Sequence, residues 1–352
     1  MKTLHTKAAI LTLLAGLVWS SGSAFAQTTI WGGRGLLRVQ SAETIGRRTF
    51  YLNSYFGTFL QAKPQQTTLG KDHTLTIGLT YGFSPLLEIT AMLTPYQDDQ
   101  QSVWGPPGDS QLGLKFRTPF SGRAIITSVW LFTRIPTAKV ANVPFEPYSS
   151  GKLGAGAMAI MTLDMTESFP LFPLKAHFNF GYMDHNLKDA LFNDPEDQFF
   201  LGFGFKFPIR STIVYTEYTA EVFANNPAIT QFNQNSQRIT QGLKFLGPRN
   251  LIFDIALDIS LARKPENPDQ VFLKEYASWK FYVGINYQFF FDRSERGFAA
   301  RQRSRNGNAK KLELPPDVNE RRQRIQDELQ KMEKTLIEEK EKAKKNKSDN
   351  DN

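Results

Sequence analysis

The sequence predicts an all-β membrane barrel of about twelve antiparallel strands, followed by a short C-terminal helical tail. Three observations support this fold class. One stretch near residue 285 alternates strictly between large apolar and polar residues, other stretches of similar length do so less regularly, and the connections between them alternate between short and long. Apolar residues outside, polar residues inside, and short turns opposite long loops are typical of outer-membrane barrels.

The strongest alternation covers Trp279–Phe291, where every second residue is large and apolar and the residues between them are mostly polar. This is the period of a strand with two unlike faces. The alternative for this stretch alone is an edge strand of a soluble sandwich. Its Gly284, Tyr287 and Phe289 also resemble the closing-strand signal that assembly machinery reads in outer-membrane barrels, and we expect them to act as that signal.

The other strand candidates fill the chain from residue 49 onwards at roughly the ten-residue length of a tilted barrel strand. They are 49–60, 74–81, 87–94, 111–117, 124–135, 154–163, 174–182, 198–207, 211–222, 239–245 and 251–261. Connections after the even-numbered strands are short or medium, and those after the odd-numbered strands are mostly long. A soluble sandwich has no reason to sort its loops in this way, so the pattern favours a barrel with both termini in the periplasm.

The first 26 residues have a basic start, a short apolar run and an Ala24-Phe25-Ala26 ending, which predicts a secretory signal peptide. The mature chain would then begin at Gln27, and 27–48 would be a leader into a barrel at 49–292. We expect export to the outer membrane of a Gram-negative-type bacterium, with outer-membrane lipid and the barrel assembly machinery as partners.

The composition excludes several classes of function. There is no cysteine, which excludes disulfides and thiolate metal sites. The net charge of +8 comes largely from the tail, where 293–352 hold 17 Lys and Arg against 12 Asp and Glu. The body at 27–292 has 23 against 22, so it is nearly neutral and shows no nucleic-acid footprint. The 29 Phe and 11 Tyr suit aromatic girdles.

Three segments resemble outer-membrane transporter-type barrels likened to the meta-pathway phenol-degradation family. They are 81–88 (YGFSPLLE), 108–116 (GDSQLGLKF) and 179–182 (NFGY). The resemblance implies a barrel that passes or binds small solutes and does not name the solute. The chain departs from the pattern at Pro136-Thr137-Ala138, where such barrels often show Pro-x-Gly, and in its long tail.

The predicted inner face carries charges of both signs. Either they form internal ion pairs that fill the lumen, or they line a polar permeation path. Recurring inner-face glycines would open space or allow strand curvature. The lumen-facing candidates are Glu88, Lys115, Arg117, Lys175, His177, Lys206, Glu217, Glu221, Lys244, Asp254, Asp258 and Lys280.

No catalytic motif is present: the sequence has no Gly-x-Ser-x-Gly elbow, His-Glu-x-x-His motif or P-loop. Of the histidines beyond the signal peptide, His73 lies at a strand start, His177 on the inner face and His185 in a loop. A Ser/His site built from separate strands is conceivable, but nothing singles one out. We expect no enzyme activity, no cofactor and no metal.

The tail divides into a basic linker at 293–316, a charged helix at 317–345 and a disordered end at 346–352. Asp317 and Glu320 have capping-box spacing, and Ile325, Leu329, Met332 and Leu336 share one helix face. This helix is either a solvated single helix or one that docks on a periplasmic partner or a second copy. Two hypotheses follow: a barrel that passes or binds small solutes, hydrophobic ones included, or a structural barrel that anchors the tail to an envelope partner without transport.

Overall fold

The computed structural model describes residues 27–62, 69–99, 105–119, 122, 124–166, 173–189, 194–209, 211–229, 231–247, 250–263 and 275–290. No helix within these ranges is long and apolar enough to cross a membrane. The predicted signal peptide, basic linker, charged helix and C-terminal end lie outside the described residues, as does Phe291.

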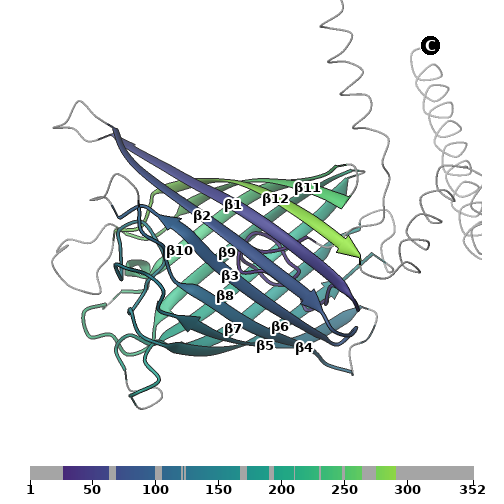
Figure 1. Cartoon of the computed structure of the whole chain (residues 1–352), viewed down its shortest axis with the longest axis horizontal. Coiled ribbons are helices and arrows are strands. Elements are labelled where there is room, and N and C mark those ends of the chain that lie inside the picture. Colours follow the sequence, from purple (N-terminus) through teal and green to yellow (C-terminus); the bar gives the residue numbers. More distant parts are fainter. Residues whose placement is uncertain are drawn as a thin grey trace, which may run out of the picture. The chain divides into compact units, whose positions relative to one another are not determined.

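Twelve antiparallel strands close into one barrel, because each strand pairs with its neighbour in the chain and the last pairs with the first (Figure 1). The predicted antiparallel barrel of about twelve strands is therefore confirmed. A single-turn 3-10 helix, η1 (Phe232–Gln234), lies between two of the strands. The strands are β1 (Thr49–Ala62), β2 (Leu69–Gly82), β3 (Leu87–Gln97), β4 (Ser110–Arg117), β5 (Ile125–Ile135), β6 (Gly154–Asp164), β7 (Lys175–Asp184), β8 (Gln198–Ile209), β9 (Thr212–Phe223), β10 (Ser236–Leu246), β11 (Leu251–Ser260) and β12 (Trp279–Phe290).

The two faces of the strands follow the alternation in the sequence. On β12, Val283 and Ile285 are 41% and 47% exposed, whereas the intervening Gly284 and Asn286 are buried. Apolar side chains face outward on the other strands too, which is the reverse of the arrangement in a soluble protein. Other exposed apolar side chains include Leu52, Phe56, Ile89, Leu112, Val129, Phe180, Phe205, Ile239, Leu243, Phe253, Ile255 and Leu257.

Strand β12 closes the barrel on β1, with a register that runs from Thr49 opposite Phe290 to Thr58 opposite Phe281. In this register Gly284 lies opposite Tyr55. A Cβ on Gly284 would lie 2.3 Å from the Tyr55 ring, so only glycine lets that ring lie flat across the inner wall. The rings of Tyr287 and Phe289 meet edge to face at 4.4 Å near the end of the strand.

Residues 27–45, which we call the N-terminal plug, lie inside the barrel (Figure 1). All of them are buried except the half-buried Trp31 and Arg34. Gly32 and Gly33 both adopt positive φ, 76° and 75°, which allows a tight turn beside the wall. The sequence indicates only a leader in this region; the structure adds that the segment folds back into the lumen before β1 begins.

Candidate functional site: the filled lumen

Several backbone N–H groups of the plug donate to side chains of the wall. Glu217 of β9 accepts hydrogen bonds from the N–H groups of both Arg38, at 2.9 Å, and Val39, at 3.0 Å. Further along, Glu88 of β3 accepts from the N–H of Ile45 at 2.9 Å. The plug also forms backbone hydrogen bonds with itself, such as Ile30 N–H to the Leu37 carbonyl at 2.9 Å, and the wall acceptors satisfy N–H groups that these internal bonds leave over.

The carbonyl groups of the plug are matched in the same way by wall donors. The Lys244 ammonium on β10 donates to the carbonyls of Thr28 and Leu36, both at 3.1 Å. Lys115 of β4 donates to the Ser41 carbonyl at 3.0 Å. The plug is therefore held mainly by polar contacts, which water can replace if the segment leaves.

Arg38 is the charged contact at the centre of the plug. Its guanidinium forms an ion pair with Asp258 of β11 at 2.7 Å and donates to the Tyr282 hydroxyl at 2.8 Å. Burial by itself would lower the pKa of Arg38, but Asp258 and Tyr282 raise it above its ordinary value. The charge therefore stays on the guanidinium, paired across the lumen.

Apolar contacts add to this anchoring. Leu36, Leu37 and Val39 of the plug pack in one buried cluster with Tyr55 and other inner-wall residues. A Cβ on Gly204 of β8 would lie 2.4 Å from Leu36, so this wall glycine makes room for the plug. Trp31 stacks on Trp130 of β5 with ring centroids 6.1 Å apart. The inner-face glycines therefore receive large neighbouring side chains and do not leave open space.

A second segment, the crossing loop at 136–153, covers the other end of the lumen. It leaves β5 and returns to β6, yet its Glu146 contacts Thr74 of β2 and Lys280 of β12. Its Phe145 lies 5.1 Å from the Phe59 ring of β1. Since β6 and β12 lie on opposite sides of the strand order, the loop spans the mouth.

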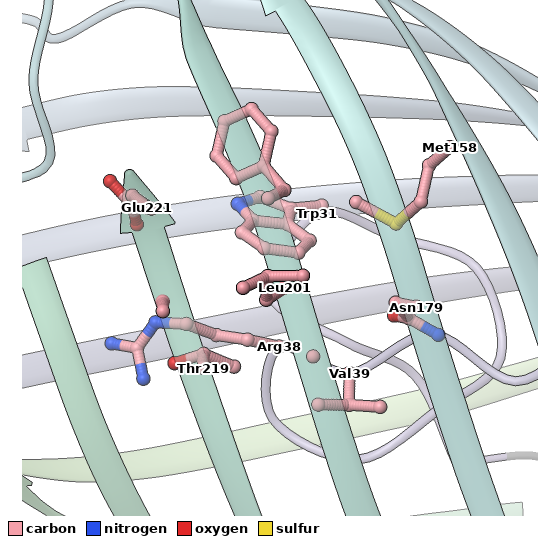
Figure 2. A pocket seen from close by; sticks show the side chains of 11 residues that line it. Trp31, Arg38, Val39, Met158, Asn179, Leu201, Thr219 and Glu221 are labelled. Atoms are coloured by element: carbon pink, nitrogen blue, oxygen red, sulfur yellow. The ribbon is translucent and has the colours of Figure 1, made fainter. Parts of the chain in front are cut away.

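Small cavities lie between the plug and the wall among the described residues. Two cavities of about 10 Å³ each flank Trp31. Figure 2 shows one of them, with Arg38 and Thr219 on one side and Met158 and Asn179 on the other. A cavity of this size holds about one water molecule. Neither can hold a solute, and at this level of the barrel the plug occupies the lumen.

The structure places the residues expected to face the lumen on the inner wall. Several pair with each other: Lys115 with Glu88 at 2.5 Å, and Lys244 with Asp254 at 2.8 Å. Glu221 pairs with Arg238 of β10 at 3.3 Å. Arg117 and Lys175 are half-buried, and the fully buried members are Glu88, Lys115, His177, Lys206, Glu217, Glu221, Lys244, Asp254, Asp258 and Lys280.

A further charged group, which we call the turn-end cluster, lies where the short turns join the strands. Glu43 of the plug pairs with Arg34 at 3.2 Å and with Lys175 of β7 at 2.6 Å, and Lys175 also pairs with Asp164 at 2.5 Å. Burial by itself would raise the pKa of Glu43, but Arg34, Lys206 and Lys175 lower it below its ordinary value. Glu43 is thus a carboxylate held among cations.

The histidines of the described ranges lie in separate surroundings. His185 follows β7, and burial and the nearby Arg134 lower its pKa to about 3, so it is neutral. Its Nε2 lies 2.9 Å from the Gln198 side chain. Within the described residues, no group of three or more His, Asp or Glu is arranged to hold a metal ion.

Sequence reasoning missed the residues that join the plug and the crossing loop to the wall, among them Arg38, Glu43 and Glu146. Their partners lie far away in the chain, and no local pattern marks them. The uncharged inner residues Tyr55 and Asn179 were missed as well, although both lie on the inner face of their strands. For these two, the strand alternation was a usable signal.

A scan against protein-family models and a search of curated proteins found no match. Among solved structures, an outer membrane channel from Pseudomonas putida F1 is 8% identical, covers 70% of this chain and 98% of its own, and has a TM-score of 0.47. The KdgM porin is 6% identical with a TM-score of 0.44, over 68% and 99% of the two chains. The NanC porin is 9% identical with a TM-score of 0.43, over 67% and 98%.

Proposed function

We propose that the chain is an outer-membrane barrel that passes or binds small solutes, hydrophobic ones included, and that the N-terminal plug closes it. It acts without catalysis, and its solute enters when the plug and the crossing loop rearrange. One observation carries this proposal: the strands form a polar inner wall, and a separate segment, the N-terminal plug, fills the lumen that this wall encloses.

The outer surface supports a place in a membrane. Around the barrel, exposed positions are occupied by apolar side chains such as Leu52, Phe253 and Ile285. In water this surface would be a large unpaired apolar patch. In lipid it is the expected outer face of a closed barrel, which leaves no unpaired strand edge. The signal peptide expected at 1–26 agrees with export.

The way in which the lumen is filled favours a gated channel over a barrel whose interior is permanently filled. Barrels of eight strands are filled by their own side chains, whereas those with sixteen or more hold open channels. With twelve strands, this barrel needs an extra segment to fill it, and that segment is held mainly through groups such as Glu217, Lys244 and Lys115. Without the plug, these same groups would line a hydrated path.

The second candidate is a structural barrel that anchors its C-terminal tail to a periplasmic partner or a second copy. The filled lumen favours it, because the plug occupies the inside of the barrel in this conformation. The two functions differ in what happens when the plug is loosened: a channel conducts, while a structural barrel with no usable path does not.

We expect Glu217→Ala to produce open-channel events in a planar bilayer that the unchanged protein shows rarely. The change leaves two buried N–H donors without an acceptor. Losing one bond to a charged acceptor costs about 1.5–3 kcal/mol, which shifts the plug equilibrium at least about tenfold. The measurement is single-channel conductance of purified protein.

The matched control is Glu221→Ala. Glu221 lies on the same strand and face, but it pairs with Arg238 of the wall and with no plug residue among those described. This variant should stay as closed as the unchanged protein. A folded Glu217→Ala protein that stays closed under the same voltages would count against gating by the plug.

A further prediction concerns the assembly machinery as a partner. Changing Tyr287 and Phe289 to Ser should lower the outer-membrane level of the protein more than changing Phe203 and Phe205 to Ser. Both pairs meet edge to face at 4.4 Å, but only the first lies on the strand that closes the barrel. Deleting Leu312–Asn352 should leave the level unchanged. Membrane fractionation measures all three, and loss of insertion only in the deletion would contradict the role of β12.

A further inference from the structure

Two buried hydrogen-bond donors at the turn end of the lumen have no acceptor among the described residues. The Lys206 side chain on β8 is 5% exposed, and it has neither a hydrogen bond nor an ion pair within the described part of the chain. His177 of β7 is fully buried, and its Nε2 also lacks a partner there. A largely buried ammonium without a protein acceptor needs water or a ligand as its partner.

The two groups are close enough to share one small ligand. Lys206 lies directly opposite Lys175 in the β7–β8 register, and His177 is two residues further along the same face. Lys206 and His177 are therefore diagonal neighbours, which lie about 7–8 Å apart at the backbone. Their side chains project into the same part of the lumen, so an acceptor of a few atoms can reach both.

The contact of the other imidazole nitrogen, Nδ1, allows the tautomer in which the Nε2 proton faces this space. His177 Nδ1 lies 2.9 Å from the Thr162 hydroxyl, which itself accepts from the N–H of Ala42 at 2.9 Å. The Thr162 hydroxyl can donate to Nδ1, and in that tautomer the neutral ring carries its proton on Nε2. Nε2 is then a donor, like the Lys206 ammonium beside it.

The charges of the turn-end cluster also favour the binding of an anion. Its cations are Arg34, Lys175 and Lys206, and its carboxylates are Glu43 and Asp164, so the formal charges sum to +1 with Lys206 protonated. The carboxylates already contact Arg34 and Lys175, and neither pairs with Lys206. The Arg34 and Lys175 side chains are 19% and 18% exposed, so the cluster is open to solvent on one side.

We propose that Lys206 and His177 form a binding site for a small oxyanion, a phosphate or carboxylate group, with Arg34 and Lys175 supplying further positive potential. An oxyanion offers acceptors to both donors at once, and hydrogen bonds between charged groups are the strong ones. The site is part of the wall next to Glu43, so its occupant lies against the plug. The proposal does not depend on whether the barrel conducts.

The test is the 31P line width of inorganic phosphate titrated with purified, detergent-solubilised full-length protein, followed by competition with acetate. Saturable broadening is expected, and Lys206→Met should weaken the apparent affinity at least about tenfold. Lys152→Met is the matched control, because Lys152 is exposed and pairs with Glu196 in a loop; it should bind as the unchanged protein does. Displacement by acetate indicates a site for carboxylates as well, and its absence a site for phosphate alone.

Folding of each variant is checked by its heat-modifiable migration on a gel. If Lys206→Met does not fold, Lys206→Arg, which keeps the charge, and His177→Phe, which removes the Nε2 donor, are measured instead. Binding should persist in the first and weaken in the second. The proposal is overturned if the unchanged protein shows no saturable broadening, or if folded Lys206→Met binds phosphate as tightly as the unchanged protein.

Discussion

Deleting Thr28–Ile45 opens the barrel: in a planar bilayer, the variant is expected to show stable conductance steps that the unchanged protein lacks. The deletion removes the segment that fills the lumen and leaves every strand intact. The wall groups that held it, including Glu217, Lys244 and Lys115, then take water as their partner. Because twelve strands enclose more space than wall side chains alone fill, the path hydrates.

The control for this deletion is removal of Leu312–Asn352, which follows the closing strand and should leave the protein closed. The effect should also depend on the crossing loop, because Glu146 and Phe145 still span the opposite mouth. If conductance rises further when Glu146→Ala is combined with the deletion, the plug and the crossing loop are two separate barriers to conduction. A folded deletion variant without conductance would instead favour the structural barrel.

The second large effect is expected from a charge on the outer face. Val283→Arg places a guanidinium at mid-strand on a residue that is 41% exposed at the outer surface. Arginine on the lipid face costs about 2–4 kcal/mol at the bilayer midplane. Since β12 also closes the barrel, we expect a strong loss of folded, heat-modifiable protein.

Asn286→Arg, on the opposite face of the same strand, is the matched comparison. Asn286 is fully buried and accepts a hydrogen bond from the Thr28 hydroxyl of the plug. The larger side chain should displace this part of the plug while the barrel remains folded, so its expected signature is conductance and not loss of protein. Equal loss of folded protein from both changes would refute the assignment of the two faces.

The barrel wall could be predicted from the sequence because its signal is local. In a strand with one lipid face and one polar face, each pair of neighbouring residues repeats the same contrast, so Trp279–Phe291 alone indicates the period. The charged inner positions follow from the same alternation: Glu217 and Glu221 lie four residues apart on one face.

The plug could not be predicted in the same way. Its contacts are between residues far apart in the chain, as with Thr28 and Asn286, which are separated by 258 positions. It has no repeated period, because each of its backbone groups meets a different strand. The one signal in the sequence that this segment is buried was the presence of apolar residues such as Leu36, Leu37 and Val39 in a region expected to be a leader. The crossing loop was marked only by its length and its prolines.

The plug also imposes an order on the maturation of the molecule. Its residues leave the ribosome before any strand does, and with the export proposed above they also cross the inner membrane first. The surface that receives the plug, however, combines β3, β9, β10 and β12. That receiving surface is complete only once β12 has paired with β1. The first part of the mature chain to be made must therefore be the last to dock, as an intramolecular ligand tethered through residues 46–48 at a high effective concentration. Until then its apolar and polar groups are unshielded, so periplasmic chaperones would meet this segment for longer than any other part of the chain.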